Sequence, residues 1–380
     1  REPGGTPAGE RVREVLLDPA VELAAFHGIT LTFAVYHGPP AATFTRSPVH
    51  APRFVAFLQH LARTYPQVKD FIVGNEPNKA LFWQPVFTPK GAGASCAAYE
   101  RLLAASYDGL KAVDQRIRVI GLGLGPRGTD NARARGNLSI SPVRCIRDLG
   151  RAYRSSRRRR PIMDELSVHG HPNSAADPLE TGYRWPNAGI PNLARIKQAV
   201  WDAFRGTAQP TFQEAGMPTG PTRTLKLRWN EVGWEVSIPP AFRGHYYGEE
   251  KVVTTDEGTQ AAIYGNLVPL AACDPVVKSV LFFNLVDEAN LGRWQSGLLR
   301  ADWTRRPSYA FVKGAITART ARCNRRLVRW RHAPAVLGPR VKFPSARRSR
   351  SERNTAWSFV AGAQEGTVFT AGLFKVTKGG

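Results

Sequence analysis

The sequence predicts an α/β fold in which helices cover a mainly parallel sheet that is either open or closed into a barrel. Short apolar, β-branched segments alternate with longer amphipathic ones, which is typical of repeated strand–helix units. The 380 residues, 42% of them hydrophobic, can bury a sizeable core, so a wholly disordered chain is excluded. Glycine and proline follow no period, which excludes a collagen-like chain.

The expected strands and helices alternate in order along the chain. Each expected strand is an apolar run that ends in turn residues, and these runs are Ile29–Val35, Phe71–Val73, Arg118–Leu124, Met163–Val168, Leu225–Trp229 and Val280–Leu285. The expected helices, which show amphipathic spacing, are Val21–His27, Pro52–Thr64, Ala97–Val113, Pro142–Arg154, Ile190–Phe204 and Thr259–Ala272. The strands lie roughly 35 to 60 residues apart, which allows long loops after them, where barrel enzymes hold their active sites.

Composition divides the chain into two parts. Residues 1–316 carry the strand–helix units and are expected to form a barrel domain. Residues 317–380 are expected to be a basic linker followed by a small β-hairpin appendage. The chain has a net charge of +23, and residues 301–380 hold 17 basic and 3 acidic residues. This segment either attracts polyanions or is a solvated surface, and no nucleic-acid-binding motif accompanies it.

Cysteine spacing and hydropathy limit the remaining classes. Cys96, Cys145, Cys273 and Cys323 form no Cys-x-x-Cys pair and no zinc-like spacing with histidine, so neither a metal site nor a cofactor is predicted. Cys273 lies in an apolar run and is interpreted as a small core residue, while three disulfide pairings stay open. The glycine run 121–125 leads into a loop rather than a helix, which argues against a dinucleotide site. No segment has the roughly 20 consecutive apolar residues of a membrane span.

Two of the expected strands end on glutamates. Asn75-Glu76-Pro77 follows one strand and Glu231 ends another. Pro77 disfavours helical geometry at Glu76, so that residue is expected to be extended. Carboxylates at the carboxyl ends of barrel strands converge at the mouth, where retaining glycosidases hold an acid/base and a nucleophile roughly 5–5.5 Å apart. Repulsion between the two charges is expected to raise the pKa of Glu76, which would act as the acid. The alternative is two unrelated loop carboxylates.

These motifs resemble those of the clan-A retaining glycoside hydrolases, the (β/α)8 group that includes cellulases, mannanases, xylosidases and β-galactosidases. More closely, the chain is similar to uncharacterised secreted cellulase-like proteins of actinobacteria. The resemblance implies a TIM-type barrel in which Glu76 is the acid/base at the end of strand four and Glu231 is the nucleophile at the end of strand seven. Strand six of the clan commonly ends His-x-Tyr, and here His169-Gly-His171 stands in its place.

The resemblance also predicts an incomplete barrel. If the strand at 71–73 is strand four, the sequence before it holds only strand three, so the first two βα units are expected to be missing. An N-terminal truncation is the expected cause, because an open barrel exposes unpaired strand edges.

Further residues near the strand ends are predicted to bind a sugar. An amide can hydrogen-bond a substrate hydroxyl, and sugar rings stack on exposed aromatic faces. For the tryptophans, core packing is the alternative, and for His169 a structural hydrogen bond is as plausible as a substrate contact. The predicted substrate-binding set is Asn75, His169, His171, Trp83, Trp234, Asn284 and Trp294.

Three functions from different classes follow from these observations. The first is a retaining glycoside hydrolase that cleaves β-glycosidic bonds of a poly- or oligosaccharide, with no cofactor and no specific nucleic-acid partner. The second is an inactive carbohydrate-binding barrel, and the third is a polyanion-binding protein that uses the basic C-terminal segment. The resemblance implies an extracellular or cell-surface location, while the sugar, the linkage and the oligomeric state stay open.

Overall fold

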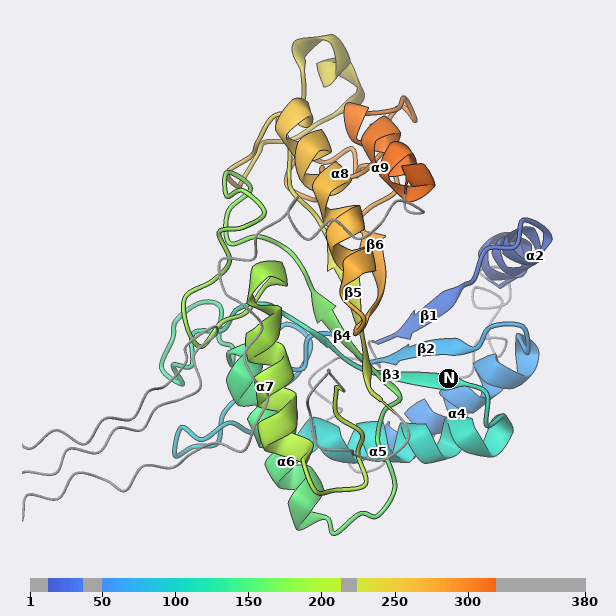
Figure 1. The fold of residues 1–380 in the computed structure, drawn as a ribbon, viewed down its shortest axis with the longest axis vertical. Coiled ribbons are helices and arrows are strands. Elements are labelled where there is room, and N and C mark those ends of the chain that lie inside the picture. The colour runs from blue at the N-terminus through green and yellow to red at the C-terminus, as the bar shows by residue number, and fades with distance from the viewer. Residues whose placement is uncertain (1–12, 37–49, 213–223, 319–380) are drawn as a thin grey trace, which may run out of the picture.

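The structure is a computed structural model that describes residues 13–36, 50–212 and 224–318 (Figure 1). Its centre is a six-stranded sheet in which every strand is parallel to its neighbours and the spatial order is the chain order. The strands are β1 (Thr32–Val35), β2 (Asp70–Val73), β3 (Arg118–Leu124), β4 (Glu165–His169), β5 (Lys226–Val232) and β6 (Val277–Phe282). The six predicted strands are confirmed, although β1 begins three residues later than expected and β6 three residues earlier.

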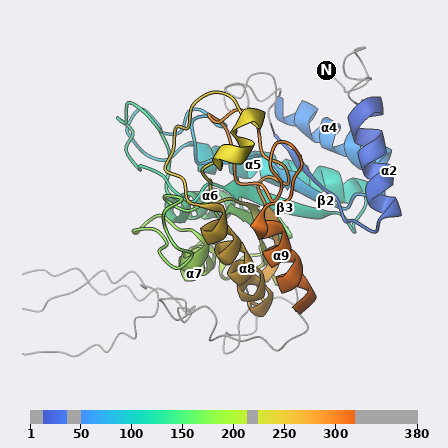
Figure 2. The ribbon, with the colours of Figure 1, turned by 90° about the horizontal axis from the view of Figure 1, so that it is seen from above.

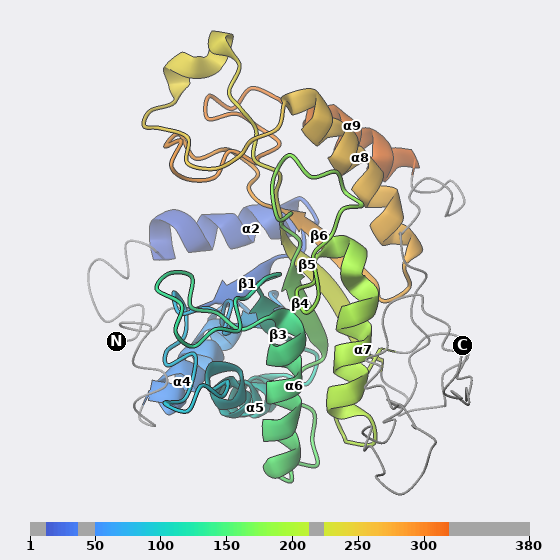
Figure 3. The same ribbon diagram turned by 90° about the vertical axis from the view of Figure 1, so that its left-hand side faces the viewer.

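Helices connect successive strands and cover the outside of the sheet. They are α2 (Asp18–Phe26), α4 (His50–Thr64), α5 (Ser95–Val113), α6 (Pro142–Ser155), α7 (Leu193–Phe204), α8 (Glu257–Cys273) and α9 (Pro307–Thr317), with short turns η1 (Arg13–Leu17), η2 (Ile190–Asn192) and η3 (Pro240–His245). Figure 3 shows α4 to α7 following one another around one face, while α8 and α9 pack together beyond β6. Figure 2 shows the same pairing of α8 with α9 from above.

Local sequence explains where several of these elements begin. Proline occupies the first turn of both α6 and α9, where its missing N–H breaks no helical hydrogen bond. At the start of α8, the Asp256 side chain accepts a hydrogen bond from the Thr259 N–H at 2.9 Å and caps the helix. Strand β2 is buried along its whole length, as expected for a strand of a parallel sheet that is covered on both faces.

The sheet is strongly curled, as a barrel wall is. In a flat sheet β5 would lie roughly 14 Å from β2, because neighbouring strands are about 4.8 Å apart. Yet Arg228 of β5 donates to Asp70 of β2 at 2.6 Å and to the Thr32 hydroxyl of β1 at 3.3 Å. The six strands therefore form part of a TIM-type barrel. Among the described residues, β1 pairs with β2 alone and β6 with β5 alone.

A buried ion network fills the inside of this curled sheet near the strand starts. Arg228 also donates to Glu165, and Arg118 pairs with Asp70 and lies 3.8 Å from Glu165. Asp70, Glu165 and Arg228 are each less than 5% exposed. Buried charges of this kind require paired partners, because an unpaired one loses its hydration without compensation. We refer to Asp70, Arg118, Glu165 and Arg228 as the floor network.

One disulfide links two neighbouring helices. Cys96 at the start of α5 and Cys145 in α6 are bonded, and both are fully buried. Cys273 is also disulfide-bonded, and it is only half-buried at the end of α8, so its interpretation as a small core residue is wrong. The apolar run before it is divided, because Leu270 and Ala271 are buried while Ala272 is exposed at the last turn of α8.

We expect replacement of both Cys96 and Cys145 by alanine to lower the free energy of unfolding by about 2–4 kcal/mol. The bond closes a loop between residues 49 positions apart, and its loss frees the unfolded chain. Urea unfolding monitored by tryptophan fluorescence measures this change. The variant should also lose part of the wild-type protein's sensitivity to reductant, and unchanged stability would contradict the prediction.

Two further expectations concern a membrane span and the C-terminal appendage. None of the described helices is both long and apolar enough to cross a membrane. The predicted appendage at 317–380 lies almost wholly outside the described residues, which end at residue 318.

Candidate active site

The two predicted glutamates lie at the same edge of the sheet. Glu76 comes three residues after β2, and Glu231 is the penultimate residue of β5. Both positions are at the carboxyl ends of their strands, which is the catalytic face of TIM-type barrels. The Glu76 side chain is 9% exposed and that of Glu231 is 23% exposed, so both are sheltered but reachable.

The backbone at Glu76 differs from the expectation. Its φ is +37°, a left-handed conformation, so the prediction of an extended residue is wrong. The N–H of Glu76 donates to the carbonyl of Gly123 in β3 at 2.9 Å, which holds this turn against the neighbouring strand. Left-handed backbone at a residue other than glycine, asparagine or aspartate is costly and persists where surrounding contacts enforce it.

His169 brings the two carboxylates together. It is the last residue of β4, it is 1% exposed, and the register pairs it directly with Glu231 of β5. Its Nδ1 lies 3.0 Å from Oε1 of Glu76 and 3.2 Å from Oε2 of Glu231. Two oxygens this close to one nitrogen cannot be separated by the roughly 6.5–9.5 Å that inverting glycosidases require. The nearest oxygens of the pair therefore fall within reach of the retaining geometry.

Each carboxylate also has a contact of its own. The Lys79 ammonium donates to Oε1 of Glu76 at 2.8 Å, and Nε2 of His171 lies 3.3 Å from Oε2 of Glu231. Behind His169, the side-chain amide of Asn230 lies 3.4 Å from Nε2. Four of the predicted functional residues thus share one cluster with Lys79 and Asn230, and we call Glu76, Glu231, His169 and His171 the carboxylate–histidine cluster.

The charges of the cluster oppose the expected rise in the pKa of Glu76. Burial alone would raise it, but hydrogen bonds and charges from His169 and Lys79 outweigh burial and lower it to about 2. For Glu231 burial likewise acts upwards, and the neighbouring His169 and His171 reverse it, so that its pKa is also lowered. The expectation that repulsion dominates is wrong, because Lys79 and the two histidines contact the carboxylates directly.

Glycines of β3 and the following loop make room for the cluster. A Cβ atom on Gly125 would lie 2.8 Å from Oε1 of Glu76 and 2.7 Å from Cε of Lys79. A Cβ on Gly123, whose φ is +52°, would lie 3.2 Å from Oδ1 of Asn75 and 3.5 Å from Nε2 of His169. The glycine run that resembles a nucleotide motif therefore serves close packing around the carboxylates.

Of the three tryptophans predicted to stack on a sugar, one stays a candidate and two are too deeply buried. Trp294 is half-buried, and its ring stacks on His171 at 4.5 Å and meets Phe283 edge-on at 5.4 Å. Trp83 and Trp234 are only 5% and 2% exposed, so their prediction as open stacking platforms is wrong. Their rings meet Tyr99 and Tyr264 edge-on in the core, and this burial leaves little of either ring open to a sugar.

Asn75 and Asn284 are both half-buried, and their substrate-binding roles stay predictions. Asn75 lies beside His169, as its position against Gly123 shows. Lys79, Asn230 and Phe283 belong to the same neighbourhood but are absent from the predicted set. Lys79 and Asn230 could have been found from their spacing, since Lys79 follows Glu76 by three residues and Asn230 immediately precedes Glu231, whereas Phe283 comes near only through the tertiary structure.

A separate buried carboxylate lies just beyond the cluster. Glu235 is 9% exposed and accepts a hydrogen bond from the Gln295 N–H at 2.9 Å. Burial raises its pKa to about 7, an effect that the Gln295 hydrogen bond opposes and the charges of Glu250, Asp287 and Glu288 reinforce. Glu235 is therefore protonated in the folded protein at pH values where the unfolded chain has already lost the proton.

We expect Glu235→Gln to change how stability depends on pH. Between about pH 4.5 and 7 the folded wild type binds more protons at this site than the unfolded chain, so wild-type stability falls as pH rises through this window. Glutamine keeps an oxygen for the Gln295 N–H and cannot titrate. The stability of the variant minus that of the wild type should therefore increase from pH 5 to pH 8 and then level off. Parallel urea titrations at several pH values measure it, and a constant difference would contradict the prediction.

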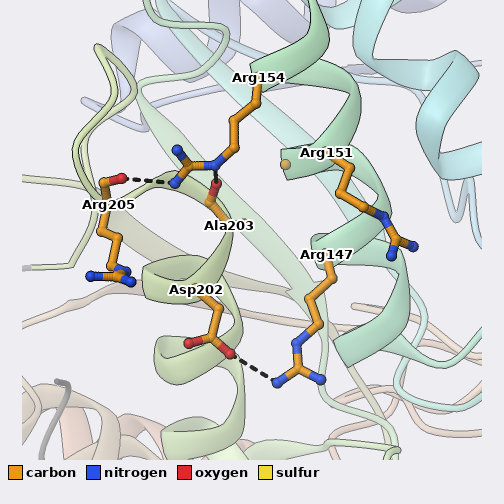
Figure 4. A pocket seen from close by; sticks show the side chains of 7 residues that line it. Arg147, Arg151, Arg154, Asp202, Ala203 and Arg205 are labelled. Carbon is orange, nitrogen blue, oxygen red and sulfur yellow. Dashed lines mark hydrogen bonds and ion pairs between the residues drawn. The ribbon is translucent and has the colours of Figure 1, made fainter. Parts of the chain in front are cut away.

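A basic groove lies on the outer side of the sheet, between α6 and α7 (Figure 4). Its volume is about 370 Å³, and Arg147, Gly150, Arg151, Arg154, Asp202, Ala203 and Arg205 line it. Arg147 pairs with Asp202 at 2.8 Å, and Arg154 donates to the carbonyls of Ala203 and Arg205 at 3.0 and 2.7 Å. These contacts fasten α7 to α6, so two of the four arginines are engaged in helix packing.

Comparisons with known proteins place the fold. No protein-family model matches the sequence, and no curated protein does. Solved structures do match, among them a family 39 glycoside hydrolase from the gut symbiont Bacteroides cellulosilyticus WH2, with 18% identity over 81% of this chain and 54% of that one and a TM-score of 0.51.

Two further matches have lower TM-scores. A monomeric β-xylosidase from Caulobacter crescentus CB15 is 17% identical over 78% of this chain and 55% of that one, with a TM-score of 0.46. A thermostable mutant of a xylanase from Cellvibrio japonicus is 15% identical over 79% of this chain and 82% of that one, with a TM-score of 0.47. This chain spans about half the length of the family 39 hydrolase and of the β-xylosidase. At these identities the likeness concerns the fold: the described strands and helices are arranged as in part of a TIM-barrel glycoside hydrolase.

Proposed function

We propose that this protein is a retaining glycoside hydrolase that cleaves β-glycosidic bonds of a poly- or oligosaccharide. The observation that carries the proposal is the shared contact of Glu76 and Glu231 with Nδ1 of His169 at the carboxyl ends of three strands. The two contacts keep the nearest carboxylate oxygens closer together than the roughly 6.5–9.5 Å of inverting enzymes, which supports a double-displacement reaction. The likeness of the fold to a family 39 glycoside hydrolase supports the same class.

In this proposal Glu231 is the nucleophile and Glu76 is the acid/base. Glu231 is ionised in the free protein, as a nucleophile must be, and His169 and His171 fix its Oε2. Glu76 must gain a proton before it can donate one to the leaving oxygen. A sugar oxygen that displaces the Lys79 ammonium from Oε1 would remove one of the two partners that keep Glu76 ionised. After glycosyl transfer, the same carboxylate would activate water.

The experiment is hydrolysis of a panel of aryl β-glycosides by the purified chain, with the configuration of the first-formed sugar read by NMR. We expect turnover with a β-anomer as the initial product. An α-anomer would show an inverting reaction and contradict the proposed roles. Sugar binding without turnover across the panel would favour the inactive carbohydrate-binding barrel instead. The polyanion-binding alternative depends on residues beyond 318, outside the described part of the chain, and stays a prediction.

We further propose an extracellular or cell-surface location. The Cys96–Cys145 disulfide supports it, because such bonds persist in oxidising compartments and are rare in the cytosol.

We expect Gly125→Ala to slow hydrolysis on the order of 100-fold without unfolding the protein. The added methyl group would meet Oε1 of Glu76 and Cε of Lys79 well inside contact distance, and a shift of about 1 Å at a reacting group has an effect of that size. The measurement is kcat/KM for an aryl β-glycoside together with the melting temperature.

Gly136→Ala is the matched control for this substitution. It lies in the same loop region between β3 and α6, and no atom lies within 4 Å of the added Cβ. Its kinetics should equal those of the wild type. Equal rates for Gly125→Ala and Gly136→Ala would show that Gly125 does not shape the cluster.

A further inference from the structure

The two histidines and Glu231 form a set of metal-binding groups as well as a catalytic cluster. The ligand atoms of His169, His171 and Glu231 all lie within 4.8 Å of one another. They come from the end of β4, the residue two positions later, and β5, so the sheet itself sets their spacing. No Cys-x-x-Cys or histidine spacing in the sequence indicates such a site, because the third ligand is 60 residues away.

The spacing fits a tetrahedral ion. Zinc binds imidazole nitrogen and carboxylate oxygen at about 2.0–2.1 Å, which places neighbouring ligand atoms of a tetrahedron roughly 3.3 Å apart. Oε2 of Glu231 lies 3.2 Å from Nδ1 of His169 and 3.3 Å from Nε2 of His171. Two of the three ligand–ligand edges therefore already have the required length. The third edge, between the two histidine nitrogens, is within 4.8 Å and has to reach the same length when the ion binds.

The surroundings support a bound cation in three ways. Asn230 lies at Nε2 of His169, its Oδ1 has no hydrogen-bond partner, and a rotation of the amide by 180° would present that oxygen to an Nε2–H. Such an acceptor behind a ligating histidine orients the ring for metal binding. The cluster has a net negative charge when the imidazoles are neutral, because two carboxylates, Glu76 and Glu231, face one ammonium group, that of Lys79. His169 is fully buried, which limits competition from bulk water.

We propose that His169, His171 and Glu231 bind one zinc ion, with water in the fourth position on the side of Glu76. A mixed nitrogen and oxygen ligand set of this kind suits zinc better than calcium or magnesium, which take oxygen ligands. Zinc binding stands apart from the proposed hydrolysis. Its consequence for activity rests on the proposed function: a Glu231 carboxylate held by zinc cannot attack a sugar, so zinc inhibits the glycosidase reversibly.

The test is calorimetric titration of the chelator-treated full chain with zinc chloride. We expect one saturable site per chain and an anomalous scattering peak between the three side chains in crystals soaked with zinc. His171→Phe keeps an aromatic ring against Trp294 but removes one ligand. It should weaken binding at least about 100-fold, because loss of even an outer hydrogen bond to a ligand costs roughly 10–100-fold. Asn230→Ala removes only the acceptor behind His169, so it should weaken zinc binding by roughly 10–100-fold.

His245→Ala is the matched control, because His245 is 54% exposed and lies in η3, apart from the cluster. It should bind zinc as the wild type does. Absence of a saturable site, or equal affinity in His171→Phe and wild type with both melting alike, would overturn the proposal. An aryl glycosidase assay run beside the titration keeps the two proposals separable. Stoichiometric zinc binding to a chain without hydrolysis leaves the zinc site standing, whereas hydrolysis insensitive to zinc at saturation shows that the metal lies elsewhere.

Discussion

Replacing Glu231 with alanine is expected to abolish turnover of every β-glycoside, whatever its leaving group. Without this carboxylate no covalent glycosyl-enzyme can form, and no other described carboxylate in the cluster faces the sugar from β5. Turnover should fall below detection even for dinitrophenyl glycosides, which need no protonation. Added azide should partly restore reaction by attacking the sugar directly and should release the inverted α-glycosyl azide.

Replacing Glu76 with alanine should produce a different kinetic pattern. Dinitrophenyl glycosides should still load the enzyme, because general acid help is worth roughly 10²–10⁴-fold only where the leaving group needs a proton. The glycosyl-enzyme should then accumulate, since Glu76 is also needed to activate water. Burst kinetics and mass spectrometry measure this accumulation. Azide should rescue this variant with the β-configured glycosyl azide as product.

The products of azide rescue decide between the two roles. If Glu76→Ala yielded the α-azide and Glu231→Ala the β-azide, the assignment of nucleophile and acid/base would be reversed. If neither substitution changed the rate, the two glutamates would not be the catalytic pair, and the shared contact with His169 would be structural.

The floor network yields the largest expected effect on stability. Arg228→Leu is expected to lower the free energy of unfolding by about 3–5 kcal/mol, the range for removing one partner of a buried ion pair. Arg228 joins Asp70 at 2.6 Å and also pairs with Glu165, so the substitution leaves two buried carboxylates without their shared cation. Arg118 can compensate only in part, because it is 38% exposed and its Nε lies 3.8 Å from Glu165. Urea unfolding measures the loss.

A triple variant separates charge from packing at the same place. Asp70→Asn and Glu165→Gln combined with Arg228→Leu remove the stranded charges and keep similar volumes, so much of the lost stability should return. If the single and triple variants were equally unstable, the arginine would act through its packing against β1 and β2, and the prediction about charge would be wrong.

The sequence by itself determined the order of strands and helices and the two strand-end glutamates. Periodicity is a local property: β3 was predicted at its observed bounds, and β2 and β5 to within a few residues, because each apolar run carries its own signal. Because the strands are parallel, a glutamate at the end of each must reach the same edge of the sheet. The backbone conformation of Glu76 could not be predicted in the same way. Pro77 favours an extended residue before it, but a hydrogen bond to β3 holds Glu76 in a left-handed turn.

Only the tertiary structure decided what surrounds these glutamates. The curl of the sheet brings β5 to within one side chain of β1 and β2, and with it come the floor network and the bridging position of His169. Packing of helix and loop residues buries Trp83 and Trp234, and the contacts gathered at the strand ends set the pKa directions of both carboxylates. The pairing of Cys96 with Cys145 and the spacing of the histidines around Glu231 are likewise set by tertiary contacts. These properties arise from distances between residues far apart in the chain, and those distances are set by how the strands close on one another rather than by any local pattern of residues.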